Sequence, residues 1–72
     1  MKFQIMDHTG HTTAVFDKAD KLSMEEAEKR FKDLTGSGFR AAEMSEGKEG
    51  RLLKSFNPDA ETVLFEPPLQ GG

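Results

Sequence analysis

A single amphipathic helix, set among short β-favouring runs, is the feature that most restricts the fold of this chain. Between residues 23 and 34, apolar side chains recur at helical spacing, at Met24, Ala27, Phe31 and Leu34. Ser23 and Glu26 have the spacing of a capping box, and Gly36 is placed to end the helix. Acid-before-base pairs four residues apart predict ion pairs on the solvent face, at Glu25–Lys29, Glu26–Arg30 and Glu28–Lys32. One helix with one apolar face predicts one sheet for it to cover.

Five short runs predict the strands of that sheet, at residues 2–7, 12–16, 39–45, 51–56 and 61–66. The first two flank a short polar connection and predict a hairpin. In the fourth run, Leu52 and Phe56 are expected to share one face, and Pro58 favours a turn at residues 57–60. The predicted order is β-β-α-β-β-β, an α+β fold with one helix packed across a single mixed sheet. The helical crossover favours a parallel pairing between a hairpin strand and a later strand.

Composition argues against several classes of function. At 72 residues the chain is expected to form one domain with a small core. It has no Cys, which excludes disulfides, thiolate metal sites and a nucleophilic thiol within it. Its net charge of −3 argues against nucleic-acid binding, which usually needs a basic stripe. No apolar run approaches the ~20 residues of a membrane span, and the N-terminus lacks a signal-peptide pattern. We therefore expect a cytoplasmic protein that binds neither nucleic acids nor membranes.

Two histidines near the first turn raise the question of a metal site. Asp7, His8 and His11 supply at most three ligands, on a short polar connection with no helix to fix their spacing. A solvated turn explains these residue types better, because turns collect them readily. We expect no metal, no cofactor and no catalytic site. A small metal-dependent enzyme or sensor that uses His8 and His11 stays as an alternative.

The C-terminus combines three physically different segments. Residues 63–65 are apolar and β-favouring, and Pro67 and Pro68 then stop the strand because proline cannot donate to a sheet ladder. Gly71 and Gly72 end the chain without side chains. Fully extended, residues 67–72 would reach roughly 20 Å, at about 3.3 Å per residue. Such a tail could thread into a narrow channel of a partner.

The element order and this ending resemble the β-grasp fold of ubiquitin-like proteins. The last eight residues are similar to the end of the small sulfur carriers of molybdopterin synthesis, and the thiamin sulfur carriers and ubiquitin-like small modifiers end similarly. The order of helix and strands resembles that of the family over nearly the whole chain, and the last eight residues resemble a more specific sequence motif of the carriers. The connection from His8 to His11 matches no carrier signature, and the chain is somewhat short for the group.

The resemblance implies a β-grasp domain at residues 1–66, with the last strand beside the first at the sheet centre, and a flexible tail at residues 67–72. It implies that an E1-like enzyme adenylates the Gly72 carboxylate with ATP. The product would become a thiocarboxylate for a sulfur-accepting synthase, or would be joined to lysines of target proteins. The chain would be a carrier rather than an enzyme. Besides Gly71 and Gly72, the tail residues implied to contact the partner are Pro67, Pro68, Leu69 and Gln70.

Apolar and basic residues on the strands suggest how such a partner could dock. Val15, Leu53 and Leu64 are expected on the sheet face away from the helix, where they would form a partly apolar docking surface, or an ordinary scatter of exposed residues. We also expect three cations on the same face, where they would steer an acidic partner: Arg40, Arg51 and Lys54.

A Gly-Gly end also occurs by chance, and terminal residues are often disordered. The alternative function is therefore a β-grasp protein-binding module or accessory subunit with no C-terminal chemistry. The choice between sulfur carrier and protein modifier stays open.

Overall fold

The computed structural model describes residues 1–7, 9–45 and 48–68, and this part of the chain contains one helix and five strands. They are β1 (Lys2–Asp7), β2 (Gly10–Val15), α1 (Lys21–Gly36), β3 (Arg40–Ser45), β4 (Lys48–Leu53) and β5 (Thr62–Glu66). The predicted order β-β-α-β-β-β is confirmed. Over the described residues, no helix combines the length and apolar character needed to cross a membrane.

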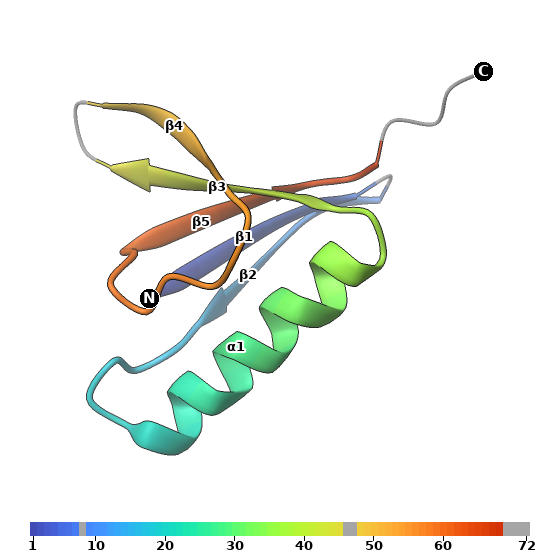
Figure 1. Cartoon of the computed structure of the whole chain (residues 1–72). Coiled ribbons are helices and arrows are strands. Elements are labelled where there is room, and N and C mark those ends of the chain that lie inside the picture. The colour runs from blue at the N-terminus through green and yellow to red at the C-terminus, as the bar shows by residue number, and fades with distance from the viewer. Residues whose placement is uncertain (8, 46–47, 69–72) are drawn as a thin grey trace.

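The strands form one mixed sheet in the order β2-β1-β5-β3-β4, with α1 lying across one of its faces (Figure 1). β1 pairs with β2 antiparallel and with β5 parallel, and β3 pairs antiparallel with β5 and β4. The predicted parallel pairing of a hairpin strand with a later strand is therefore confirmed. β5 is the central strand, paired with neighbours on both sides.

The core lies between α1 and the sheet. Alternating residues of β1 and β5 point toward the helix, so that Phe3, Val63 and Phe65 are fully buried. From the helix, Ala27 and Phe31 meet them, and the Phe65 ring centroid lies 4.9 Å from that of Phe3 and 5.7 Å from that of Phe31. These edge-on pairs add to the burial of the rings. Ala27, Phe31 and Leu34 of the predicted stripe are confirmed as the helix face that packs on the sheet, whereas Met24 is half-buried and lines a hollow with Phe56.

The helix begins earlier than predicted, and Ser23 is not its cap. Asp20 is the N-cap, with a carboxylate oxygen that accepts a hydrogen bond from the Leu22 N–H at 3.1 Å. Ser23 lies inside the first turn, where its Oγ accepts from the Asp17 N–H at 2.8 Å. Both residue types cap helices well, and here the serine instead holds the loop that precedes the helix. At its other end the helix runs through Gly36, past the predicted end at Leu34, and Ser37 rather than Gly36 is the C-cap.

Of the three predicted ion pairs on the helix, the described residues form one. Lys32 Nζ lies 3.5 Å from a Glu28 carboxylate oxygen, with both side chains largely exposed. No ion pair joins Glu25 to Lys29 or Glu26 to Arg30 in the described part of the chain. Exposed pairs gain little over solvated charges, so the spacing alone does not hold them together.

The fourth strand is shifted from its predicted position, and its faces are exchanged. β4 ends at Leu53, and the bend at residues 54–55 breaks the alternation that placed Leu52 and Phe56 on one face. Leu53 is half-buried against the core, while Leu52 is 68% exposed. Phe56 lies beyond the strand and packs on Phe31, with ring centroids 5.8 Å apart. The turn that follows forms as predicted, with the Ala60 N–H donating to the Asn57 carbonyl at 3.2 Å.

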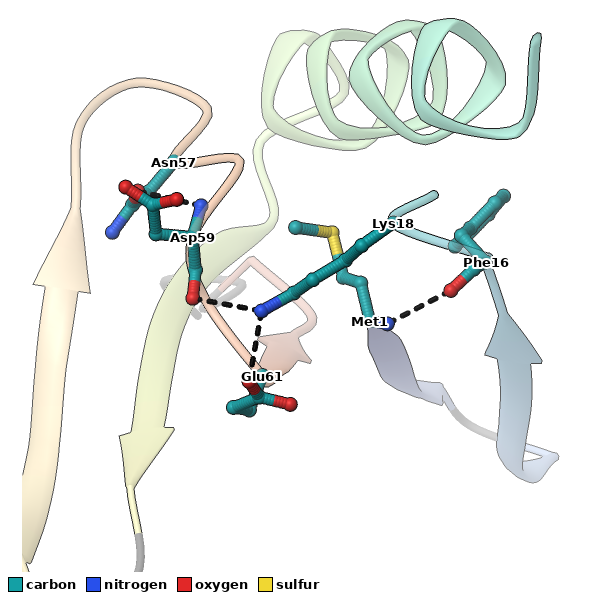
Figure 2. A network of polar contacts seen from close by, with 6 residues as sticks. All are labelled: Met1, Phe16, Lys18, Asn57, Asp59 and Glu61. Carbon is teal, nitrogen blue, oxygen red and sulfur yellow. Dashed lines mark hydrogen bonds and ion pairs between the residues drawn. The ribbon is translucent and has the colours of Figure 1, made fainter. Parts of the chain in front are cut away.

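Two loops far apart in the sequence meet at Lys18 (Figure 2). Its Nζ donates to the Asp59 carbonyl at 3.0 Å and to a Glu61 carboxylate oxygen at 2.9 Å. The hydrogen bond from Lys18, and then the lysine's positive charge, hold the pKa of Glu61 below its usual value of 4.5. In the same view the Met1 amine donates to the Phe16 carbonyl at 2.8 Å, beside the start of the sheet. The two Lys18 contacts tie the loop before α1 to the loop before β5.

Candidate functional site

The site to which the sequence points begins where β5 ends. Phe65 is the last β5 residue in register with β1, and Glu66 is paired with Arg40 of β3. Pro67 and Pro68 follow, half-buried and exposed respectively, outside the strand. Proline has no N–H to continue the ladder, so the chain leaves the sheet here. The central strand therefore leads directly into the predicted tail.

The root of the tail lies against the turn between α1 and β3. Gly38 in this turn has φ of 98°, a conformation that other residues rarely adopt. A Cβ built on Gly38 would lie 3.2 Å from Pro68 Cβ and 3.5 Å from Pro68 Cγ. The glycine thus permits both the turn and the close approach of the proline. The Gly38 N–H donates to the Thr35 carbonyl at 3.1 Å, which links the turn to the end of the helix.

The structure accounts for only part of the predicted site. Pro67 and Pro68 stand at the exit from the sheet. Leu69, Gln70, Gly71 and Gly72 lie outside the described residues, so the predicted activation site at Gly72 stays a prediction. The contact of Gly38 with Pro68 was not foreseen, because glycine at the end of a helix has an ordinary capping role and its tertiary neighbour is far along the chain.

In the turn between β1 and β2, Asp7 and Thr9 form hydrogen bonds with each other, which explains why these polar residues occur there. An Asp7 carboxylate oxygen accepts hydrogen bonds from the Thr9 N–H at 2.8 Å and from Thr9 Oγ1 at 2.7 Å. This is an Asx-turn, in which the Asp side chain accepts a hydrogen bond from the backbone two residues further on. His11 is exposed on β2 opposite Met6, and His8 lies outside the described residues. Among the described side chains, no group of three or more His, Cys, Asp or Glu residues is placed to hold a metal ion.

The sheet face away from α1 carries a row of apolar residues. By register and alternation the row runs through Leu64, Ala42 and Leu52 on the last three strands of the sheet. Val15, 75% exposed, lies on the same face at the opposite edge. The predictions for Val15 and Leu64 are confirmed, whereas the prediction for Leu53 is wrong because that side chain packs against the core.

The predicted cationic group on that face is divided between the two faces. Arg40 is paired with Glu66, in the outward-facing register of the strands. Arg51 is paired with Glu43, which is itself paired with the inward-facing Val63. Arg51 therefore belongs to the helix side of the sheet, and the prediction that it shares the outer face is wrong. Lys54 lies just past the end of β4.

Comparison of the chain with family models, with curated proteins and with solved structures found no match.

Proposed function

We propose that this chain has the β-grasp fold of ubiquitin-like proteins and serves as a carrier whose C-terminal carboxylate is activated by an E1-like enzyme. The observation that carries the proposal is what precedes the tail: the central strand, parallel to β1, leads into Pro67 and Pro68, which the sequence follows with Leu-Gln-Gly-Gly. A strand paired on both sides provides a rigid base for the tail that the sequence predicts.

The chemistry of the tail supports the same proposal. A carboxylate next to two glycines has no side chain to obstruct close approach to a bound nucleotide. Two consecutive prolines restrict the tail, so that less conformational entropy is lost when it is threaded into a partner. In the proposed reaction, a Gly72 carboxylate oxygen attacks the α-phosphorus of ATP and pyrophosphate leaves. A sulfur nucleophile or a lysine amine then attacks the acyl carbon and displaces AMP.

Mass spectrometry tests this proposal directly. The full chain is incubated with ATP and an E1-like enzyme from its source cell, and the expected product is the C-terminal acyl-adenylate or, with a sulfur donor, the thiocarboxylate. The control variant lacks Gly71 and Gly72 and should keep its circular dichroism spectrum while losing the modification. If no E1-like enzyme of that cell modifies the intact chain, the proposal is wrong.

A binding module without C-terminal chemistry is the second candidate. It is favoured by exposed apolar side chains on the strands, among them Val15 and Leu52. Partner binding that survives deletion of Gly71 and Gly72 would favour this candidate, whereas binding that requires both glycines would favour the carrier.

A further inference from the structure

A hollow lies where the end of α1, the start of β3 and the end of β4 meet. Its volume is about 320 Å³, and it is open to solvent. Its apolar lining includes Phe39, Leu52 and Leu53. The volume is near the lower limit of small-ligand sites, roughly 300–1,000 Å³, so it suits one or two apolar side chains. We call this hollow, with its flanking cations, the β3–β4 groove.

Two cations flank the apolar lining. Arg40 and Lys54 are both exposed and both line the groove. Among the described residues neither forms an ion pair or a side-chain hydrogen bond, although Glu66 is paired with Arg40 across the strands. In a chain with a net charge of −3, this is a local positive site around an apolar centre. Its charge complements carboxylates rather than ammonium or guanidinium groups.

The position of the groove also indicates the shape of its occupant. β4 is the last strand of the sheet, so in the described part of the chain its outer edge pairs with no other strand. An exposed edge accepts an extended segment through main-chain hydrogen bonds, and neighbouring pockets then select its side chains. The described residues that line the groove include two cations, whereas nucleic-acid affinity depends on many phosphate contacts.

We propose that the β3–β4 groove binds an extended acidic segment of a partner protein, with an aliphatic side chain in the hollow and carboxylates against Arg40 and Lys54. The proposal goes beyond the carrier function, because it needs neither Gly71 nor Gly72. The groove adjoins the tail, since Arg40 is opposite Glu66 at the end of β5. A partner that handles the tail could therefore engage both surfaces at once.

The test is a titration of the ¹⁵N-labelled full chain with a blocked peptide, Asp-Glu-Leu-Glu-Val-Asp-Glu. The amide shifts of residues 39–41 and 52–54 are expected to move together and to saturate. Two control peptides carry Ser in place of Leu and Val, or Lys in place of every acid, and both should bind at least about tenfold more weakly. Equal binding of the three peptides, or shifts spread over the whole surface, would overturn the proposal.

Variants of exposed residues test the assignment. The double variant Arg40→Glu with Lys54→Glu and the single variant Leu52→Ala are each expected to weaken peptide binding about tenfold. Matched controls outside the groove are Lys29→Glu with Arg30→Glu and the exposed Leu22→Ala, all on the helix. These controls should bind the peptide as the unaltered chain does. Controls that weaken binding as much as the groove variants would contradict the proposal.

Other occupants give distinguishable results. Self-association through residues 52–54 that the peptide does not reverse, seen by analytical ultracentrifugation, would assign the groove to a second copy. Binding of a single-stranded oligonucleotide at the same residues, tighter than that of the peptide, would also overturn the proposal. The variant without Gly71 and Gly72 should retain peptide binding, so failure of the carrier function leaves this result unaffected.

Discussion

At the scale of single residues, Gly38 makes room for the first part of the tail at the turn between α1 and β3. Its positive φ turns the chain from α1 into β3, and the absence of a Cβ allows Pro68 to pack on the turn. Gly36, two residues earlier, has open space where a Cβ would stand, and its φ is not positive. The two glycines therefore have different roles although both lie at the end of the helix.

Gly38→Ala should lower the free energy of unfolding by about 1–3 kcal/mol, because alanine is strained at this φ. The new methyl group should also displace Pro68, which the NMR shifts of residues 66–68 would report. Gly36→Ala is the matched control and should be neutral or stabilising by up to about 1 kcal/mol. Urea unfolding measures both variants, and equal stability of Gly38→Ala and the unaltered chain would show that the turn does not require glycine.

At the scale of elements, the helix is placed by its cap and by its apolar stripe. Asp20 satisfies the Leu22 N–H, and the stripe sets Ala27 and Phe31 on the sheet. The stripe could be predicted because helical spacing is a local property. The cap could not be predicted, because Asp20 and Ser23 are both good caps and a contact with Asp17 occupies the serine.

Asp20→Ala is expected to cost about 1 kcal/mol of stability through loss of the helix cap. Asp20→Asn should stay close to the unaltered chain, because asparagine caps as well as aspartate does. Thermal or urea unfolding compares the two. A loss of similar size in both variants would point to the charge of Asp20 rather than to its capping hydrogen bond.

At the scale of the whole molecule, Lys18 joins segments that are more than forty residues apart. Its bond to Glu61 lies beside the entry to β5, the strand that leads to the tail. The carboxylate is exposed, so solvent screens the interaction and the effect on stability is small. The lowered pKa of Glu61 nevertheless gives this contact a pH dependence with a definite sign.

Because the folded state holds the pKa of Glu61 below 4.5, the contact stabilises the fold above that pH. The stabilisation is lost as the pH falls from 4.5 through the lowered pKa, where the carboxylate gains its proton. Glu61→Gln should therefore be less stable than the unaltered chain at pH 7, and the difference should vanish in acid. Urea unfolding between pH 7 and pH 2.5 measures it, with Glu25→Gln as the control. A difference that persists at the lowest pH would exclude the ion pair as its cause.

The sequence alone was sufficient to predict the helix, the strands and their order along the chain. Helical and alternating periodicities, the turn around Pro58 and the proline pair after the last strand all depend on neighbours within a few residues. From these, one helix over one mixed sheet follows, as does the parallel pairing of a hairpin strand with a later strand.

Only the tertiary structure showed which residues from distant segments contact each other and which face of the sheet each one occupies. Ser23 lost its predicted role to a contact with Asp17, and Leu53 rather than Leu52 faces the helix because Leu53 is paired with the buried Ala41. The packing of Pro68 on Gly38 and the convergence of Arg40 and Lys54 on one groove join residues remote in sequence. Such pairings depend on strand register and on where each strand ends, and a shift of one residue turns every side chain to the other face.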